Sequence, residues 1–298
     1  LRQKARRNNM GLTNKIDFAL LFTVKRANPN GDPLNGNRPR IDYDGFGEVS
    51  DVCLKRKLRN RLQDMGEAIF VQSDDRKDDA YKSLKERAEA CKAVMQYSDG
   101  KHREEFAQAA CVQWFDVRAF GQVFAYKKLG AASDVSVGVR GPVSIQSAVS
   151  VSPVLLSEMQ ITKSVNNEPS AKESGGKSSD TMGTKHRVDF GLYLAYGSIN
   201  TQLAQKTGFS DEDAEKLHQA LISLFENDAS SARPDGSMEV MQVYWWKHNS
   251  AIGQYSSAKV HRSLQVKTKE GIDPRSWEDY DITLAPLKGL TPEIYDGV

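Results

Sequence analysis

The sequence predicts an α+β protein, and three observations lead to this fold class. From residue 15 to 25, apolar and polar residues alternate, which is typical of a β-strand. Leucines at helical spacing follow within residues 51–65, and the same strand-then-helix order returns between residues 188 and 225. Further predicted strands give the order strand, helix, insertion, two strands, polar excursion, strand, helix, two strands. This order resembles an embellished ferredoxin-like (RRM-like) sandwich.

The first strand and helix have the clearest patterns. Apolar residues occupy every second position from Ile16 to Val24, so we expect a half-buried strand. A loop rich in Asn, Pro, Gly and Asp runs from Asn28 to Arg40, and loops of this length are usually functional. Ser50 or Asp51 is expected to cap a helix that ends near Met65, with Leu54, Leu58 and Leu62 as its core stripe.

The rest of the chain is assigned in the same way. Helical spacing from Tyr81 to Met95 predicts an amphipathic helix within residues 74–105. Residues 135–162 are rich in Val, Ile and Ser and predict two strands. The polar stretch 164–185 predicts a projecting excursion. A strand from Val188, a helix opened by Ser210, and strands near 239–247 and 259–267 complete the prediction.

Composition narrows the class of protein. A chain of 298 residues with a net charge of +2 is no general polycation, so a nucleic-acid surface must come from local clustering. The three cysteines have neither C-x-x-C spacing nor a nearby His partner, so we expect no disulfide, metal or other cofactor. No apolar run approaches the roughly 20 residues that span a bilayer, which indicates a cytoplasmic protein. Residues 1–14 are interpreted as a basic N-terminal tail or an artificial addition outside the fold.

The helix at 51–65 carries the strongest binding signal. Five basic residues against two acids are expected on its solvent faces, where they could neutralise several phosphates. The alternative is an ordinary solvated helix face. The five bases are Lys55, Arg56, Lys57, Arg59 and Arg61.

Two further motifs leave alternatives open. The segment Arg118–Phe124 partly matches the RRM stacking motif, but Ala119 and Gln122 replace its glycine and second aromatic, so base stacking competes with core packing. In Trp245-Trp246, the alternation of a strand sends the two rings to opposite faces, which favours core burial or a subunit contact.

No catalytic motif is evident. The Gly175-Gly176-Lys177-Ser178 stretch is no phosphate loop, because Ala171 stands where the first glycine should be and no strand-to-helix turn surrounds it. Asp32 and Asp42 flank the loop after the first strand and could hold a metal or act as a base. Isolated loop aspartates are more often turn formers.

Several motifs together are similar to those of a known family. The matching segments are Asn28–Pro33, Pro39–Asp42, Val49–Asn60, Asp116–Gly121, Gly141–Val143, Met182–Arg187 and Gly191–Tyr193. In these segments, the chain resembles the type I-C CRISPR Cascade backbone subunits (the Csd-two branch of the Cas-seven family, RAMP superfamily), and the resemblance spans about residues 15–267.

The resemblance implies a fold and a set of partners. One domain, 15–298, would form an RRM-like palm with a helical finger insertion at about 72–110 and a β-hairpin thumb at about 161–187. Copies would stack head to tail along a guide RNA (crRNA), present its bases to target DNA, and meet a Cas-five-like subunit and a large subunit. The chain would not be an enzyme.

The resemblance and the charge pattern together name the expected RNA contacts. They are Asn28, Asn30, Arg38, Arg40, Lys55, Arg56, Arg59, Arg118, Lys163, Lys185, His186 and Arg187. The alternative function is a metal-dependent endoribonuclease of the type III backbone kind, using Asp32. A third hypothesis is a purely structural protein without a nucleic-acid partner, which the near-neutral charge would favour.

Overall fold

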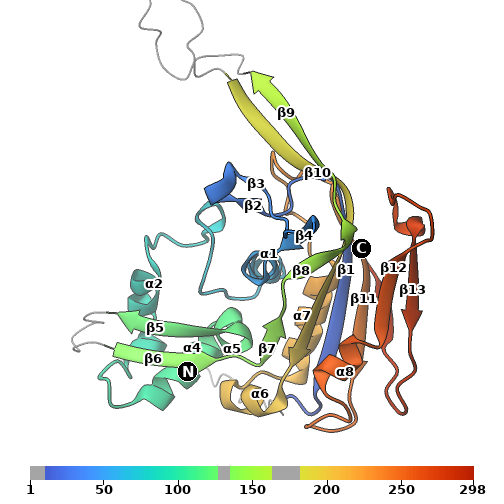
Figure 1. Cartoon of the computed structure of the whole chain (residues 1–298). Coiled ribbons are helices and arrows are strands. Elements are labelled where there is room, and N and C mark those ends of the chain that lie inside the picture. The colour runs from blue at the N-terminus through green and yellow to red at the C-terminus, as the bar shows by residue number, and fades with distance from the viewer. Residues whose placement is uncertain (1–10, 127–134, 163–181) are drawn as a thin grey trace, which may run out of the picture.

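A computed structural model describes residues 11–126, 135–162 and 182–298 (Figure 1). The strands are β1 (Ile16–Ala27), β2 (Gly31–Asp32), β3 (Arg38–Pro39), β4 (Phe46–Val49), β5 (Gly121–Tyr126), β6 (Val135–Arg140), β7 (Val143–Ile145), β8 (Ala148–Pro153), β9 (Leu156–Thr162), β10 (Met182–Ile199), β11 (Met238–Lys247), β12 (Leu264–Thr268), β13 (Tyr280–Leu284) and β14 (Glu293–Asp296). The α-helices are α1 (Asp51–Asp64), α2 (Leu84–Ala90), α3 (Lys92–Met95), α4 (Arg103–Gln113), α5 (Phe115–Phe120), α6 (Thr201–Thr207), α7 (Asp211–Ile222) and α8 (Ser257–His261). The 3-10 helices are η1 (Pro33–Asn35), η2 (Asp74–Arg76) and η4 (Trp277–Asp279).

A large antiparallel sheet forms the centre of the molecule. Its strand order is β14-β11-β1-β10-β8-β4, with β7 and β9 also paired to β10. The long strand β1 lies between β10 and β11, where Leu20 pairs with Ala195 on one side and Val243 on the other. The α+β class and the first strand are therefore confirmed.

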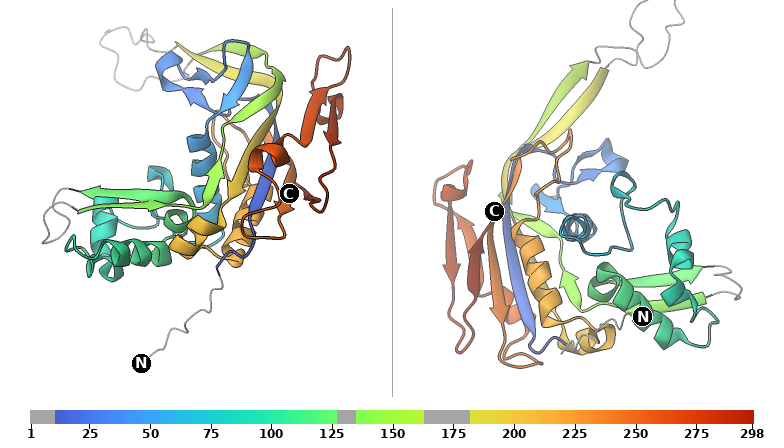
Figure 2. Two further views of the ribbon diagram at one scale, coloured as in Figure 1. Left: turned by 60° about the horizontal axis from the view of Figure 1, so that its bottom comes forward. Right: turned by 180° about the vertical axis from the view of Figure 1, so that it is seen from behind.

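The prediction that the first strand is only half-buried is wrong. Ala19 and Leu21, on its second face, are fully buried with Trp246, Val260 and Tyr280. Figure 2 shows why: β12, β13 and α8 cover this face of the sheet, while α1 and α7 cover the other. The strand expected at 259–267 begins only at Leu264, because residues 257–261 form α8. Trp245 and Trp246 are buried on opposite faces, as predicted.

Helices α1 and α7 begin where their sequences predict. The Ser50 hydroxyl accepts a hydrogen bond from the Cys53 N–H, and Ser210 and Asp213 form a reciprocal capping box. Leu54, Leu58 and Leu62 are fully buried in the main core. Leu12, within the expected tail, is also buried, and its N–H donates to the Phe209 carbonyl.

The segment after α1 forms a separate lobe with its own core, seen at the lower left of Figure 1. The single helix expected at 74–105 is wrong in extent: Ser83 caps a short α2, Cys91 is extended, and α4 begins only at Arg103. Helices α2 to α5 and the β5–β6 hairpin enclose a second hydrophobic cluster. These helices are too short to be stable alone, so this packing stabilises them.

A two-stranded arm projects from the sheet at the top of Figure 1. It consists of β9 and the first part of β10, paired antiparallel from Leu156↔Val188 to Thr162↔Met182. Of the expected excursion at 164–185, the structure describes only residues 182–185, which lie in β10; Lys163 also lies outside the described residues. The two strands expected within 135–162 are four, β6 to β9. Among the described residues, no helix is both long and apolar enough to cross a bilayer.

Candidate nucleic-acid interface

The base of the arm brings together cations from distant parts of the sequence. Arg38 on β3 places its guanidinium 2.9 Å from Glu158 Oε2 on β9, and His186 Nδ1 lies 3.7 Å from the same oxygen. Because successive residues of a strand point to opposite faces, Lys185 and Arg187 lie on the other face of the arm. There Lys185 donates to the Ser231 carbonyl, and Arg187 Nε donates to Ser157 Oγ. Arg38, Lys185, His186 and Arg187 are named the arm-base residues below.

Two asparagines fix the shape of the loop between β1 and α1 and its link to that helix. Asn28 is buried, and its Nδ2 donates to the Asn37 carbonyl at 2.7 Å. Asn30 Oδ1 accepts hydrogen bonds from the Ser50 N–H and hydroxyl, at 3.0 and 2.9 Å. Since Ser50 also caps α1, Asn30 fixes the loop to the start of that helix. Both asparagines position the loop, and their contact with RNA stays a prediction.

Asp32 and Asp42 make the contacts of turn formers. Asp32 Oδ1 accepts the Leu34 N–H at the start of η1 and lies 3.5 Å from an Arg40 guanidinium nitrogen. Asp42 Oδ1 accepts the N–H groups of Asp44 and Phe46. Within the described ranges, no three His, Cys, Asp or Glu side chains gather in a metal-binding group.

The expectation of five bases on the solvent faces of α1 is wrong. Lys57 is only 3% exposed and forms an ion pair with Asp228, over the ring of Phe225. Burial lowers the pKa of Lys57, and the Asp228 carboxylate opposes this shift. Arg59 Nε lies 3.0 Å from the buried carboxylate of Asp116.

The other bases of α1 also have partners within the chain. Arg56 donates to the Val71 carbonyl at 2.7 Å, and Arg61 donates to Ser223 Oγ at 2.8 Å. Lys55 pairs with Asp51 one turn earlier, at 3.0 Å. This partner lies within the same helix at its surface, so Lys55 remains the α1 base most open to a ligand.

Arg118 forms a mostly buried ion pair that links two helices. Its guanidinium makes two bonds to the Asp213 carboxylate, at 3.0 and 2.8 Å, and packs over the Phe115 ring. This side chain therefore joins α5 to the capped start of α7. Of the aromatics in this motif, Phe124 is fully buried in the second core, and Phe120 is half-buried against the main core with the Arg59 guanidinium over its ring, which favours the core-packing alternative.

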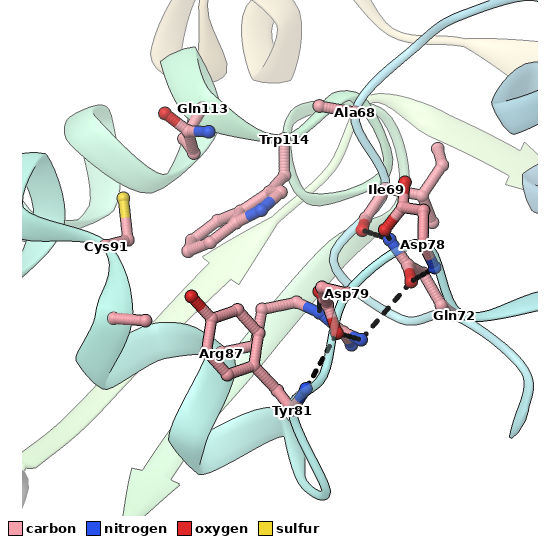
Figure 3. A pocket seen from close by; sticks show the side chains of 11 residues that line it. Ala68, Ile69, Gln72, Asp78, Asp79, Tyr81, Arg87, Cys91, Gln113 and Trp114 are labelled. Carbon is pink, nitrogen blue, oxygen red and sulfur yellow. Dashed lines mark hydrogen bonds and ion pairs between the residues drawn. The ribbon is translucent and has the colours of Figure 1, made fainter.

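A cavity of about 280 Å³ opens in the lobe formed after α1 (Figure 3). Tyr81 and Trp114 line it, together with Arg87. The Arg87 guanidinium binds both oxygens of Asp79, at 2.6 and 2.8 Å, and also donates to the Phe70 carbonyl. The hydrogen bond from Arg87 lowers the pKa of Asp79. Because its charge is matched in this way, Arg87 ties the lobe together and offers little to a phosphate.

Glu158 is a site residue that the sequence did not indicate. It lies directly opposite His186 in the arm, and its Oε2 is near two of the arm-base residues, Arg38 and His186. Only the register of the hairpin places this carboxylate there. A hairpin prediction that extended back to Leu156 would have found it.

The fold and the site together define a class: a mixed α/β protein with a large antiparallel sheet and a projecting hairpin whose base carries cations. Within this class, the chain belongs to the Cas7 family of CRISPR-associated proteins, whose model matches residues 14–285.

Individual proteins and solved structures are also similar to this chain. A CRISPR-associated protein Cas7 from Haloferax volcanii is 27% identical over 303 residues, covering 97% of this chain and 86% of the relative. A chain of a CRISPR RNA-guided surveillance complex in a pre-nicking state is 17% identical, with a TM-score of 0.46 and 78% of each chain covered. A second such complex gives 16% identity and a TM-score of 0.44, covering 78% of this chain and 68% of the other.

Proposed function

We propose that this protein is a non-catalytic backbone subunit of a type I-C CRISPR surveillance complex, binding guide RNA. In this proposal, copies assemble head to tail along the spacer and leave bases free to pair with target DNA. Membership of the Cas7 family supports the proposal. The observation that carries it is the projecting arm, whose base gathers cations from β3 and β10 beside the loop that leads into α1.

The proposed phosphate contacts come from cations outside buried ion pairs. These are Arg38, Arg40, Lys55, Lys185, His186 and Arg187, with Lys163 as a further prediction outside the described residues. The partners of Arg38, Arg40 and Lys55 are themselves partly exposed, so phosphate can replace them at small cost. Such binding depends weakly on RNA sequence and falls steeply with salt.

The test is purification from cells that express a CRISPR array. We expect RNA of one defined length to copurify and to remain uncut when incubated with magnesium. An otherwise identical culture without the array is the control. Magnesium-dependent cleavage that Asp32→Ala abolishes would replace this proposal by the endoribonuclease alternative. Protein that carries no RNA even with the other subunits of the complex coexpressed would leave the proposal without support.

A further inference from the structure

A second cavity, which is lined by cations, lies on the other side of the arm from the face that carries Arg38 and His186. It measures about 340 Å³ and forms where the end of β1, the β8–β9 connection, β10 and the segment before η4 meet. We call it the back pocket. Its charged lining consists of Lys25, Arg26, Arg187, Arg275, Asp189 and Asp273.

The lining has an excess of positive charge. Four cations face two carboxylates. Arg275 pairs with Asp273 at 3.1 Å, and Arg187 lies 3.7 Å from Asp189. Lys25 and Arg26 are exposed, and neither has a side-chain hydrogen bond or ion pair to any part of the chain that the structure describes. The pocket therefore favours an anion.

The backbone at this pocket is strained. Arg26 adopts a φ of 52°, in the left-handed region that glycine favours. Arg26 itself has no partner in the β1–β10 ladder, which pairs Lys25 with Phe190 and Ala27 with Val188 in one unchanged register. Strained residues of this kind persist where the surrounding structure holds them, and they cluster at ligand sites. A glycine would adopt the same conformation without strain, so the arginine at this position is present at a cost in backbone strain.

The chemistry of the lining matches a nucleotide. Guanidinium groups bind phosphate oxygens through paired N–H donors, and a carboxylate such as Asp189 accepts a hydrogen bond from a ribose hydroxyl. The ring of Phe190 lines the same cavity, beside Pro153 and Leu155, and offers an apolar surface for a base. A volume of about 340 Å³ suits one nucleotide rather than a folded domain.

We infer that the back pocket binds one nucleotide of single-stranded RNA, with its phosphate against Lys25, Arg26 and Arg187. This inference rests on the proposed RNA-binding function and adds a second contact, on the opposite face of the arm from Arg38. An RNA strand that passes the arm would then be held on both of its faces.

The test uses the full-length protein and fluorescein-labelled single-stranded RNA of six uridines, measured by anisotropy at several salt concentrations. Arg26→Gly removes the guanidinium and keeps the backbone conformation. We expect it to weaken binding about three- to tenfold and to make the salt slope shallower by about 0.7. Its thermal unfolding midpoint should equal or exceed that of the wild type, which excludes misfolding. Lys25→Ala should weaken binding similarly.

The matched control is Lys206→Ala, an exposed lysine on α6 for which the described chain provides no ion-pair partner. It should bind like the wild type. If Arg38→Ala weakens binding while Arg26→Gly and Lys25→Ala do not, the back pocket is overturned and the proposed function stands. If the wild type binds no RNA, both fail. If a deoxyuridine hexamer binds as tightly as the RNA, the ribose contact is overturned. If poly-glutamate displaces the RNA from the wild type but not from Arg26→Gly, the pocket binds an acidic protein segment instead.

Discussion

Replacing Glu158 by glutamine should strengthen RNA binding. Glu158 Oε2 lies 2.9 Å from the Arg38 guanidinium and 3.7 Å from His186 Nδ1, so this carboxylate neutralises Arg38 beside two side chains that are proposed to face RNA. Glutamine keeps the size of the side chain and removes its negative charge. Arg38 is then free to pair with a phosphate, and the repulsion between Glu158 and that phosphate disappears.

The size of the gain follows from the exposure of this pair. The side chains of Arg38 and Glu158 are 45% and 52% exposed, so a dielectric near that of water applies. A carboxylate about 5 Å from a phosphate then costs about 1 kcal/mol, or about fivefold in Kd. One additional phosphate contact should steepen the slope of log K against log salt by about 0.7 for a single strand. The ion pair is exposed, so its loss should hardly affect folding.

Anisotropy titrations of guide-length RNA at four or more salt concentrations measure both quantities. Glu104→Gln removes an exposed carboxylate on α4, in the other lobe, and should change neither the affinity nor the slope. In an Arg38→Ala background, Glu158→Gln should lose most of its effect. Unchanged affinity and slope for Glu158→Gln alone would refute the placement of Arg38 against a phosphate.

Three further changes test the fold that supports the site. Asp17→Asn should destabilise the protein by about 3 kcal/mol in urea unfolding at pH 7, because Asp17 is fully buried and bound by Lys15 at 2.9 Å and His248 at 2.8 Å. Burial raises the pKa of Asp17, but the bonds from His248, Ser257 and Lys15 outweigh burial and lower it, so the difference from wild type should shrink as the pH falls below about 4. Gly121→Ala should cost at least about 3 kcal/mol, because Gly121 has a φ of 82° and a Cβ would lie 2.4 Å from the Val139 carbonyl oxygen; Gly138→Ala, in the same hairpin with open space around it, is the control. His218→Phe should reduce the loss of thermal stability between pH 7.5 and 5.5, since burial lowers the pKa of His218 and the folded state resists its protonation; an unchanged loss would contradict this reasoning.

Local patterns in the sequence were sufficient for the parts of the fold that depend on near neighbours. The leucine stripe of α1 and the caps at Ser50 and Ser210 involve residues three or four positions apart, so spacing alone predicts them. The opposite burial of Trp245 and Trp246 follows from the two-residue period of a strand. These elements position the loop and the arm, and their existence was predictable.

The features that local patterns did not predict depend on contacts between residues distant in sequence. The second face of β1 is buried because β12, β13 and α8, more than 200 residues later, fold back over it. Lys57 reads as a solvent-facing base in the sequence of α1, but its partner Asp228 is 171 residues away. Counting the cations of one helix cannot show which of them pair with carboxylates that the tertiary fold brings close.

This pairing decides which cations are available to RNA. Three basic side chains are matched to carboxylates in mostly buried pairs: Lys57 with Asp228, Arg59 with Asp116, and Arg118 with Asp213. Moving one of them to a phosphate would leave a buried carboxylate unpaired, at a cost of about 3 to 5 kcal/mol, whereas a phosphate contact near water returns about 1 kcal/mol. In the proposed function, RNA would therefore be bound by cations whose partners are exposed or absent from the described chain, such as Arg38, Lys55 and Arg26. The basic residues of α1 mainly stabilise the fold, and we propose that the two faces of the arm provide the charge that contacts RNA.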